Sequence, residues 1–464
     1  MAIIAQRLRL LWGSILILPL IYLYWPNYVS HLLHTRPWRR ATGPIANGTA
    51  GFSKILVINR PARTDRRDAM ALAAAVSNLT LEWVDGVNGD TVEERVLPPG
   101  ERPKHKSSDI AVKGSWRAHM NALRRVVEEG LPCALIMEDD VDWDLRVKSQ
   151  LQTFGAASKA WLQTSREMAS QPDGLLTEKD RLGIYKTRRR GVGNRGTSTA
   201  DLEVEERYSI YLDQIHVTND PASVDHPYGE GWDVLWLGQC GTEFPDANAT
   251  ALPPLRAVVP NDPTVPAPQH LKPHPFASHD VLGELYPPHT RVVHAASSPR
   301  TACTLAYAVS QRGARKLLWQ FGLEDFSRQW DLMLGSWCAG GYVEGASDGG
   351  ESDNSHADRP EDGKDDTNSE ASVAKGSRDS KERRERRRRP RQPPTCLTVQ
   401  PPIFGHYFAK KGASDIRGQG GGYVSKVGTP YVRWSVRMNL DVLTEGGTSA
   451  DIVDQLPDEG EAVW

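Results

Sequence analysis

Short apolar runs that are rich in β-branched residues recur along this chain, and each ends in polar side chains. Residues 55–58 (ILVI) precede a polar loop and a helical stretch over 65–77, and residues 134–137 (ALIM) run directly into acidic residues. Runs of this length, bounded by polar loops, are typical of buried strands. The alternation of strand, loop and helix predicts an α/β sheet that binds its ligands at the carboxyl ends of the strands.

Further segments repeat this pattern. Residues 81–84, 233–238 and 304–309 are short apolar runs of the strand type. The last of them leads into a helix that we expect over 311–321. Between the second and third strands, residues 115–129 place apolar side chains three and four positions apart, which predicts an amphipathic helix. The fold class that these elements predict is α/β, with a Rossmann-like sheet.

The size and charge of the chain limit the classes of protein to which it can belong. It has 464 residues, of which 39% are apolar, enough for one large catalytic domain or two ordinary ones. Its formal net charge is −2, which argues against a protein that wraps nucleic acid. We therefore expect no nucleic-acid partner.

The N-terminus differs most from the rest of the chain. Residues 10–25 are apolar and uncharged, and as a helix they would cover about 24 Å, less than the ~30 Å core of a typical bilayer. We expect an uncleaved signal-anchor transmembrane segment over 1–26, since no small-residue cleavage site follows; a cleaved signal peptide is the alternative. A polar stem would follow over 27–51. The short span suits early-secretory membranes, so the expected location is the Golgi or endoplasmic reticulum membrane, single-pass type II, with a lumenal catalytic domain.

Two polar segments interrupt the domain that we expect over 52–464. Residues 165–205 are polar and basic, and we expect a surface excursion there. Residues 345–395 are acidic and then basic, and they cannot bury enough apolar surface to offset the entropy of ordering, which predicts a disordered insert. A nuclear signal or nucleic-acid patch is the alternative for the basic run. Apolar residues resume after the insert, so we expect the insertion to lie within one domain.

The cysteines give a second indication of the compartment. The five cysteines form no CxxC pair, which argues against zinc or thioredoxin-like chemistry. Cys133 comes just before an apolar strand, and we expect it to be unpaired. Cys338 and Cys396 flank the insert, and we expect them to pair across it. Three N-glycosylation sequons agree weakly with a lumenal domain.

Four acidic residues lie within five positions directly after the strand at 134–137: Glu138, Asp139, Asp140 and Asp142. If the strand continues in extended form, Glu138 and Asp140 share one face and Asp139 points away. Carboxylates paired in this way suit Mn²⁺ or Mg²⁺, which usually takes one or two protein carboxylates together with substrate phosphates. The alternative is a solvated acidic loop or a helix N-terminus.

Several motifs occur in a fixed order around this cluster. They are residues 54–60 (KILVINR), 63–67 (RTDRR), 84–86 (VDG), 114–119 (GSWRAH), 135–140 (LIMEDD), 232–238 (WDVLWLG) and 307–310 (YAVS). In this order they resemble family 25 glycosyltransferases, which include bacterial lipopolysaccharide galactosyltransferases and animal collagen galactosyltransferases.

The sequence departs from the family pattern in one element. The family's Gly-Cys-x-x-Ser-His element here reads GSWRAH over 114–119, so that His119 is kept while the Cys and the Ser are replaced. The large inserts and the segment RWSVR over 433–437 resemble a fungal-type branch.

The resemblance implies a GT-A-like glycosyltransferase fold, a UDP-sugar donor and transfer with inversion, galactose being the commonest sugar of the family. An inverting transferase needs a carboxylate base that takes the proton of the acceptor hydroxyl. Asp331 is the candidate, because the family carries an Asp after this strand and helix. The alternative role for Asp331 is that of a helix N-cap.

Other candidates follow from their place at strand ends. Asn59, Arg63 and Arg66 follow the first strand and would hold uracil, ribose or diphosphate, and Asp85 ends the second strand. The planar fork of Arg suits diphosphate, although surface-helix arginines are common. His119 would face the donor site or serve as a hydrogen-bonded structural histidine.

The function that we expect is transfer of a hexose from a UDP-sugar to a hydroxyl on a glycan or glycoprotein, with Mn²⁺ or Mg²⁺ held by Glu138, Asp139 and Asp140. The alternative is a non-catalytic lumenal glycan-binding or scaffold protein that keeps the fold, which the altered element at 114–119 favours. A metal-dependent phosphoesterase would need histidines near Glu138 in the sequence, and none lies there.

Overall fold

The computed structural model describes residues 41–99, 106–170, 184–187, 207–213, 226–245, 252–273, 280–342, 393–408 and 428–463. The expected anchor at 1–26 and nearly all of the expected insert at 345–395 lie outside these ranges. Within them, no helix is both long enough and apolar enough to cross a membrane. At the end of the expected stem, residues 41–51 pack on the domain, where Ile45 and Ala50 are buried.

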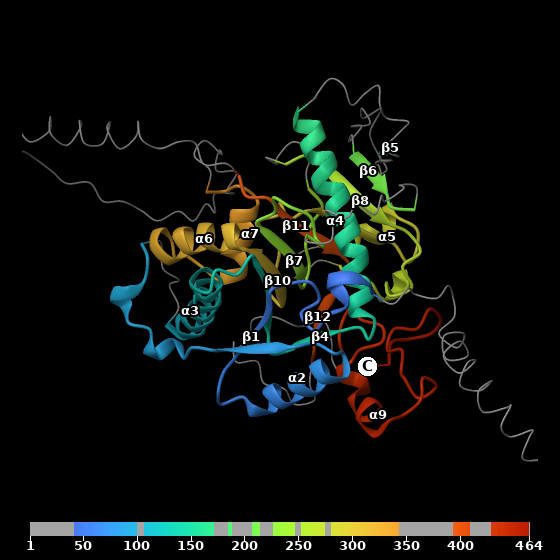
Figure 1. Ribbon diagram of the computed structural model, residues 1–464, viewed down its shortest axis with the longest axis horizontal. Coiled ribbons are helices and arrows are strands. Elements are labelled where there is room, and N and C mark those ends of the chain that lie inside the picture. The colour runs from blue at the N-terminus through green and yellow to red at the C-terminus, as the bar shows by residue number, and fades with distance from the viewer. Residues whose placement is uncertain are drawn as a thin grey trace, which may run out of the picture.

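The strands form one large mixed sheet (Figure 1). The main path runs β2-β1-β3-β10-β7-β11-β9-β8-β6-β5, and β4 and β12 pair beside it. The strands are β1 (Lys54–Asn59), β2 (Leu81–Asp85), β3 (Cys133–Glu138), β4 (Val141–Trp143), β5 (Ile184–Thr187), β6 (Arg207–Tyr211), β7 (Val234–Gly238), β8 (Leu255–Val259), β9 (Arg291–Ala295), β10 (Ala306–Ser310), β11 (Cys396–Gln400) and β12 (Phe404–His406). β1 pairs in parallel with both β2 and β3, whereas β10 is antiparallel to β3 and to β7.

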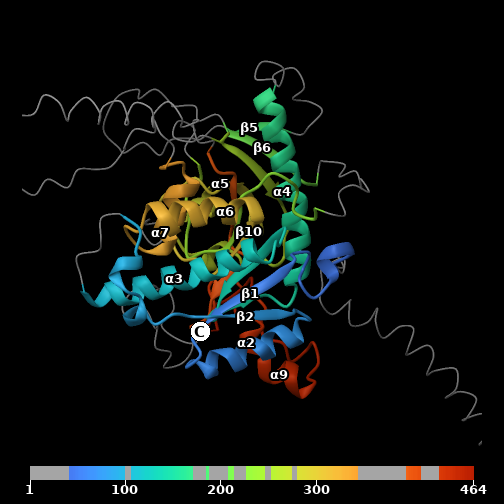
Figure 2. The ribbon, with the colours of Figure 1, turned by 60° about the vertical axis from the view of Figure 1, so that its left-hand side comes forward.

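Helices cover both faces of the sheet. They are α2 (Thr64–Val76), α3 (Lys106–Glu128), α4 (Val147–Ser170), α5 (Val281–Leu285), α6 (Gln311–Trp319), α7 (Trp330–Cys338) and α9 (Leu440–Glu445). In both views α3, α6 and α7 lie together on one side, and α4 lies away from them (Figures 1 and 2).

The pleat of β1 divides the core into two layers. Ile55 and Val57 pack in a cluster with residues of α2 and α4, and Leu56 packs with residues of α3, α6 and α7. Successive side chains of a strand point to opposite faces, so a strand covered on both faces needs apolar residues at every position. This explains why β1 has the continuous apolar run ILVI. The mixed α/β architecture as a whole fits the Rossmann-like fold expected from the sequence.

Most of the expected strands and helices are present within one or two residues, but two expectations were wrong. The helix expected from residue 115 begins at Lys106. It packs closely against the loop after β2, and this approach requires the glycine at position 114, since a Cβ there would lie 2.5 Å from the Val87 carbonyl oxygen. The surface excursion expected over 165–205 overlaps α4, which continues to Ser170, and contains β5. Its first part is helical because α4 buries Phe154 and Trp161 against the sheet.

The cysteine expectations are confirmed. Cys338 is joined to Cys396, and Cys133 is free. A second disulfide joins Cys240, just after β7, to Cys303, just before β10.

Candidate active site

Three strand ends meet at one edge of the sheet. In the parallel registers of β1 with its neighbours, Asn59 lies beside Asp85, and Ile58 lies beside Glu138. The chain then turns at 139–140 and continues as β4, which pairs antiparallel with β12 and places His406 beside Val141. The sequence therefore folds the acidic cluster to the carboxyl end of the sheet, where α/β proteins bind ligands.

The turn after β3 reverses the expected pairing of the acids. Glu138 and Asp140 do not share one face as expected for a continuing strand, because β3 ends at Glu138. Instead Arg66 Nη1 donates to Asp139 Oδ1 at 2.6 Å and to Asp140 Oδ2 at 3.0 Å. Asn59 Nδ2 donates to the other oxygen of Asp139 at 2.8 Å. Burial, and then the charge of Asp140, raise the pKa of Asp139 against the opposing effect of Arg66.

Asp140 and His406 form a half-buried acid–imidazole pair. His406 Nε2 lies 3.5 Å from Asp140 Oδ2, and its ring packs on Phe408 with the centroids 4.2 Å apart. Burial opposes the ionisation of Asp140, but the charges of His406 and Arg66 outweigh burial and hold its pKa below the usual range. Burial would lower the pKa of His406, and Asp140 outweighs this and raises it.

Three buried polar atoms at this edge have no hydrogen-bond partner among the described residues. They are Asn59 Oδ1, Asp140 Oδ1 and His406 Nδ1. Buried polar groups are nearly always paired in folded proteins, and an exception needs an explanation such as an absent ion or water. Carboxylate and amide oxygens and an imidazole nitrogen are ligand types that Mn²⁺ accepts.

The site is not a preformed metal cage. Among the residues that the structure describes, no group of three or more His, Cys, Asp or Glu side chains is arranged to hold a metal ion. Asp140 and His406 together supply two donors. This number fits a cation that takes most of its remaining ligands from substrate phosphates.

Glu138 faces a different set of residues from its two neighbours. Thr304 Oγ1 donates to Glu138 Oε1 at 2.8 Å, and His119 Nε2 lies 3.6 Å from the same oxygen. His119 is buried, its Nδ1 lies 3.0 Å from the Tyr307 hydroxyl, and its ring stacks on Trp330. His119 therefore lies in the core beside Glu138, with the contacts of a hydrogen-bonded structural histidine.

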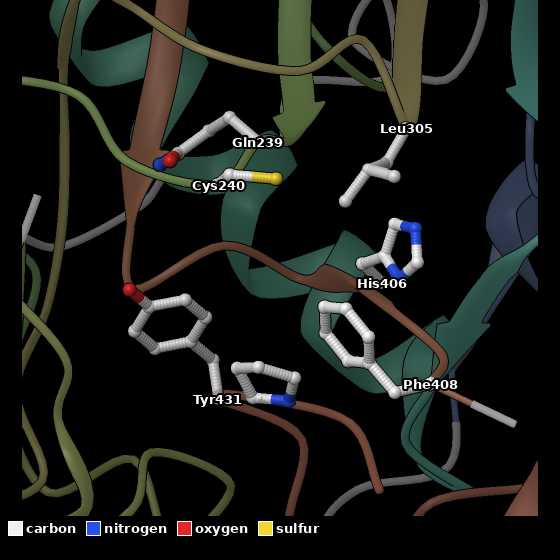
Figure 3. Close-up of a pocket in the computed structure, with 7 residues that line it drawn as sticks. Gln239, Cys240, Leu305, His406, Phe408 and Tyr431 are labelled. Carbon is white, nitrogen blue, oxygen red and sulfur yellow. The ribbon is translucent and has the colours of Figure 1, made fainter. Parts of the chain in front are cut away.

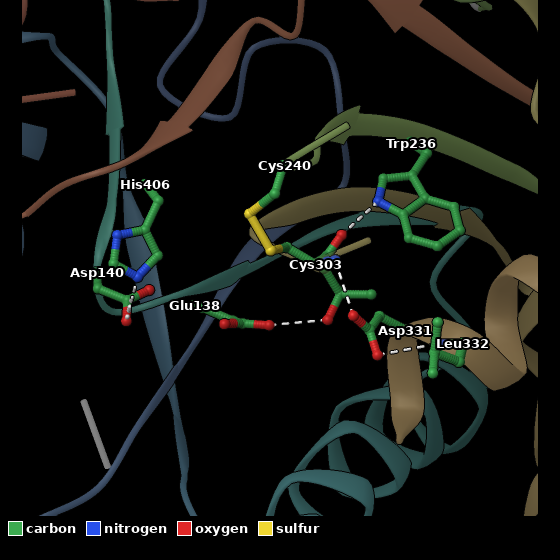
Figure 4. Close-up of a disulfide and its surroundings, with 9 residues drawn as sticks. Glu138, Asp140, Trp236, Cys240, Cys303, Asp331, Leu332 and His406 are labelled. Atoms are coloured by element: carbon green, nitrogen blue, oxygen red, sulfur yellow. Dashed lines mark hydrogen bonds and ion pairs between the residues drawn. A yellow bond between two sulfur atoms is a disulfide. The ribbon is translucent and has the colours of Figure 1, made fainter. Parts of the chain in front are cut away.

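Asp331 and Asp140 lie on opposite sides of Glu138 (Figure 4). The Asp331 carboxylate accepts the backbone N–H of Cys303 at 2.8 Å and that of Leu332 at 2.9 Å. The N-cap of α7 is Gln329, so the alternative role of Asp331 as helix cap was wrong. Burial raises the pKa of Asp331, and the charge of Glu138 acts in the same direction while the two backbone N–H groups oppose it.

The remaining candidates lie at the rim of this edge. Arg63 donates to both carboxylate oxygens of Asp65, at 2.9 and 2.8 Å. Asp85 is exposed at the end of β2. The residues expected to bind the nucleotide were Asn59, Arg63, Arg66 and Asp85. Asn59 and Arg66 contact the acidic turn. Arg63 instead pairs with Asp65 in the first turn of α2.

Asp142, the fourth acid of the cluster, is held by hydrogen bonds from the C-terminal segment. It is fully buried and accepts hydrogen bonds from Thr429 Oγ1, Ser435 Oγ and the Arg437 backbone N–H. Arg437 also donates to the Asp139 carbonyl at 2.7 Å. The C-terminal segment thereby holds β4 and the acidic turn in place.

A small, largely apolar hollow adjoins His406 (Figure 3). Gln239, Leu305 and Tyr431 contribute to its wall. Sequence reasoning missed His406, although the segment that precedes it gave the same signal as the other strands: an apolar run that ends in a polar residue. Its pairing with Asp140 joins positions far apart in the chain, and nothing local in the sequence indicates that contact.

Comparison with known proteins finds sequence similarity over part of the chain. No protein-family model matches the chain. It is 26% identical over 112 residues to procollagen galactosyltransferase 1-A of Xenopus laevis, covering 22% of this chain and 18% of that protein. It is 25% identical over 113 residues to procollagen galactosyltransferase 1 of Danio rerio, covering 22% of this chain and 19% of that protein.

A third relative gives the same result. Procollagen galactosyltransferase 2 of Homo sapiens is 27% identical over 110 residues, which cover 22% of this chain and 18% of that protein. The chain thus spans about a fifth of the length of each of these relatives. This similarity supports a family 25-like relation, while the fungal-type branch stays a prediction. Over the matched stretch, the chain is a distant relative of the procollagen galactosyltransferases.

Proposed function

We propose that this protein is a glycosyltransferase that transfers galactose from UDP-galactose to a hydroxyl on a glycan or glycoprotein, with inversion and with a divalent metal. The observation that carries the proposal is the acidic turn at the carboxyl end of β3. There Asp140 and His406 are paired, and each has one buried polar atom without a partner among the described residues, as Asn59 also has. The distant similarity to galactosyltransferases supports the choice of sugar.

Asp140 and His406 are the residues that would hold Mn²⁺ or Mg²⁺, with Asp139 and Glu138 as neighbouring carboxylates. The bound cation supplies positive charge that neutralises a departing nucleoside diphosphate. Arg66, which contacts Asp139 and Asp140, keeps both carboxylates beside a positive charge before any ligand binds. Asn59 donates to the other oxygen of Asp139 and so helps to fix its orientation.

Asp331 is the proposed base. Its carboxylate would take the proton of the acceptor hydroxyl as that oxygen attacks the anomeric carbon from the face opposite the UDP, which gives inversion. Burial raises its pKa above the ordinary range, which makes the carboxylate a stronger base. The backbone N–H groups of Cys303 and Leu332 fix its position, and such fixed positioning contributes much of the rate of a transferase.

The setting of the reaction is part of the proposal. We propose a single-pass type II protein of the Golgi or endoplasmic reticulum membrane with a lumenal catalytic domain, as the apolar run at 10–25 suggests. The acceptor is proposed only as a glycan or glycoprotein hydroxyl, since the matched stretch covers a small part of each relative.

A donor screen tests this function. The protein is incubated with UDP-galactose, UDP-glucose and UDP-N-acetylglucosamine, each with Mn²⁺ or with a chelator, and the released UDP is measured. We expect Mn²⁺-dependent release that is fastest with UDP-galactose and absent in Asp140→Ala. Glu128→Gln is a matched control, since the Glu128 side chain is 66% exposed. No UDP release from any donor, together with glycan binding, would favour the non-catalytic alternative.

A further inference from the structure

The Cys240–Cys303 disulfide lies beside the proposed catalytic carboxylates (Figure 4). It joins the residues that follow β7 to those that precede β10. The same two segments are bridged by backbone hydrogen bonds from Cys240 N–H to the Ala302 carbonyl at 2.8 Å and from Ala302 N–H to the Gly241 carbonyl at 3.1 Å. The two segments therefore form one crosslinked unit at the edge of the sheet.

Cys303 has a backbone conformation that non-glycine residues rarely adopt. Its φ is +64°, in the left-handed region, where such residues persist when their surroundings over-determine them. The surroundings of Cys303 do so on three sides. Its N–H donates to Asp331 Oδ2 at 2.8 Å, its carbonyl accepts from Trp236 Nε1 at 3.0 Å, and its sulfur is bonded to Cys240.

The next residue holds the second carboxylate. Thr304 Oγ1 donates to Glu138 Oε1 at 2.8 Å. Glu138 and Asp331 belong to β3 and α7, which are far apart in the sequence, and two like charges in a partly buried site repel each other. Residues 303 and 304 lie between them and donate one hydrogen bond to each.

We propose that Cys240 and Cys303 are positioning residues for the transfer reaction: their disulfide holds the Cys303 N–H and the Thr304 hydroxyl where they fix Asp331 and Glu138 at their working separation. This inference rests on the proposed function, because it assigns a purpose to the spacing of those two carboxylates. Neither cysteine would touch the substrate, and both would act through the backbone of residues 303 and 304.

The second disulfide provides a matched control. Cys240–Cys303 spans 63 residues and Cys338–Cys396 spans 58, so the two crosslinks restrict the unfolded chain to a similar degree. Cys338–Cys396 joins the C-terminal end of α7 to β11. Neither of these two cysteines donates a hydrogen bond to Asp331 or to Glu138. The double variants Cys240→Ser/Cys303→Ser and Cys338→Ser/Cys396→Ser are therefore expected to lower the melting temperature by similar amounts.

Only the first double variant is expected to lose catalysis. We expect its kcat to fall about 10- to 100-fold, since small displacements of catalytic groups have effects of that size. The number of UDP molecules bound per chain, measured by calorimetry with Mn²⁺, should stay unchanged, which shows that the loss is not a loss of folded protein. Amide exchange over residues 302–305 should rise in this variant and stay unchanged in the control.

Thr304 gives a test that leaves both disulfides intact. Thr304→Val removes the hydroxyl with little change of shape and is expected to lower kcat about 10-fold, and Thr304→Ser is expected to restore it. Equal kcat in both disulfide variants, with unchanged exchange at 302–305, would overturn the proposal. If the wild-type protein shows no transfer, the proposed function fails, and the exchange measurement still decides whether the disulfide holds this segment.

Discussion

The two flanks of the acidic turn contain the same residue type in opposite environments. On the outer flank, Asp140 faces the positive side chains Arg66 and His406 and keeps one oxygen without a partner among the described residues. On the inner flank, Asp142 is surrounded by neutral donors from the C-terminal segment. Charge lowers the pKa of Asp140 against the effect of burial, whereas burial raises that of Asp142.

The difference shows how two acids that are two positions apart in the chain can have different roles. The two oxygens of Asp142 together accept four hydrogen bonds from the protein, which leaves no lone pair for a ligand. Asp140 has one oxygen without a hydrogen-bond partner among the described residues and lies beside two positive side chains, so it can bind a ligand through that oxygen. We therefore assign ligand binding to the outer flank and stability of the turn to the inner flank.

The largest effect is expected at Asp331, which has a raised pKa like Asp142 but is assigned to the reaction and not to the stability of the turn. Asp331→Asn removes the proposed base and should lower kcat by about 10²- to 10⁴-fold. Initial rates of transfer at saturating donor check this. Wild-type rates in this variant would show that Asp331 is not the base and has a structural role, as Asp142 has.

The same variant has an effect on stability that depends on pH. Because burial raises the pKa of Asp331 in the folded chain, the neutral acid favours folding below the pKa of the unfolded chain, and this stability is lost as the pH rises through the folded pKa. The melting temperature of Asp331→Asn relative to wild type should therefore increase from pH 4 to pH 7. A constant difference over this range would contradict the assignment.

Asp140→Asn is expected to have the second-largest effect. Replacing a charged group that stabilises a developing diphosphate should lower kcat/KM by about 10²- to 10³-fold. The fold should be retained, since Asn keeps the shape of Asp and Arg66 keeps its contact with Asp139, although the ion pairs of Asp140 with Arg66 and His406 are lost. Kinetics over a range of Mn²⁺ concentrations, with circular dichroism as a check of the fold, measure both properties.

Asp142→Asn should show the reverse. The amide would leave donors of Thr429 or Ser435 without an acceptor, which costs about 1–3 kcal/mol for each buried group left unpaired. The free energy of unfolding in urea should fall by that amount, while kcat per UDP-binding site stays at the wild-type value. A loss of kcat as large as that of Asp140→Asn would remove the distinction between the flanks.

The smallest effect is expected at the exposed rim. Arg63 lowers the pKa of Asp65 to about 2, so the pair stabilises the fold above the ordinary pKa of Asp and loses this effect as the pH falls toward 2. The Asp65 side chain is 65% exposed, and exposed pairs contribute less than about 1 kcal/mol. Asp65→Asn should change the melting temperature at pH 7 by little, and any difference should vanish at pH 2.

The strands of this site follow from the sequence, because buried β-branched runs that end in polar residues are visible locally. β1, β2 and β3 were expected nearly where they lie, and so was their common edge. The helix α4 was not expected, although Leu151, Phe154 and Trp161 have helical spacing, because its C-terminal end lies in the polar stretch that begins at residue 165.

The contacts that define the site depend on long-range packing. The turn at 139–140 sets which acids face Arg66, and the pairing of β12 with β4 brings His406 to Asp140. The disulfide between Cys240 and Cys303 likewise depends on β7 and β10 being neighbours. None of these contacts has a periodic or compositional signal in the sequence.

Titration calorimetry with UDP tests the central claim most directly. Wild type, Asp140→Asn and Asp142→Asn are each titrated with UDP in the presence and in the absence of Mn²⁺. We predict Mn²⁺-dependent binding in wild type and in Asp142→Asn, and its loss in Asp140→Asn. Binding of UDP that is independent of Mn²⁺, or that is the same in Asp140→Asn as in wild type, would contradict a metal–diphosphate site at the outer flank of the turn.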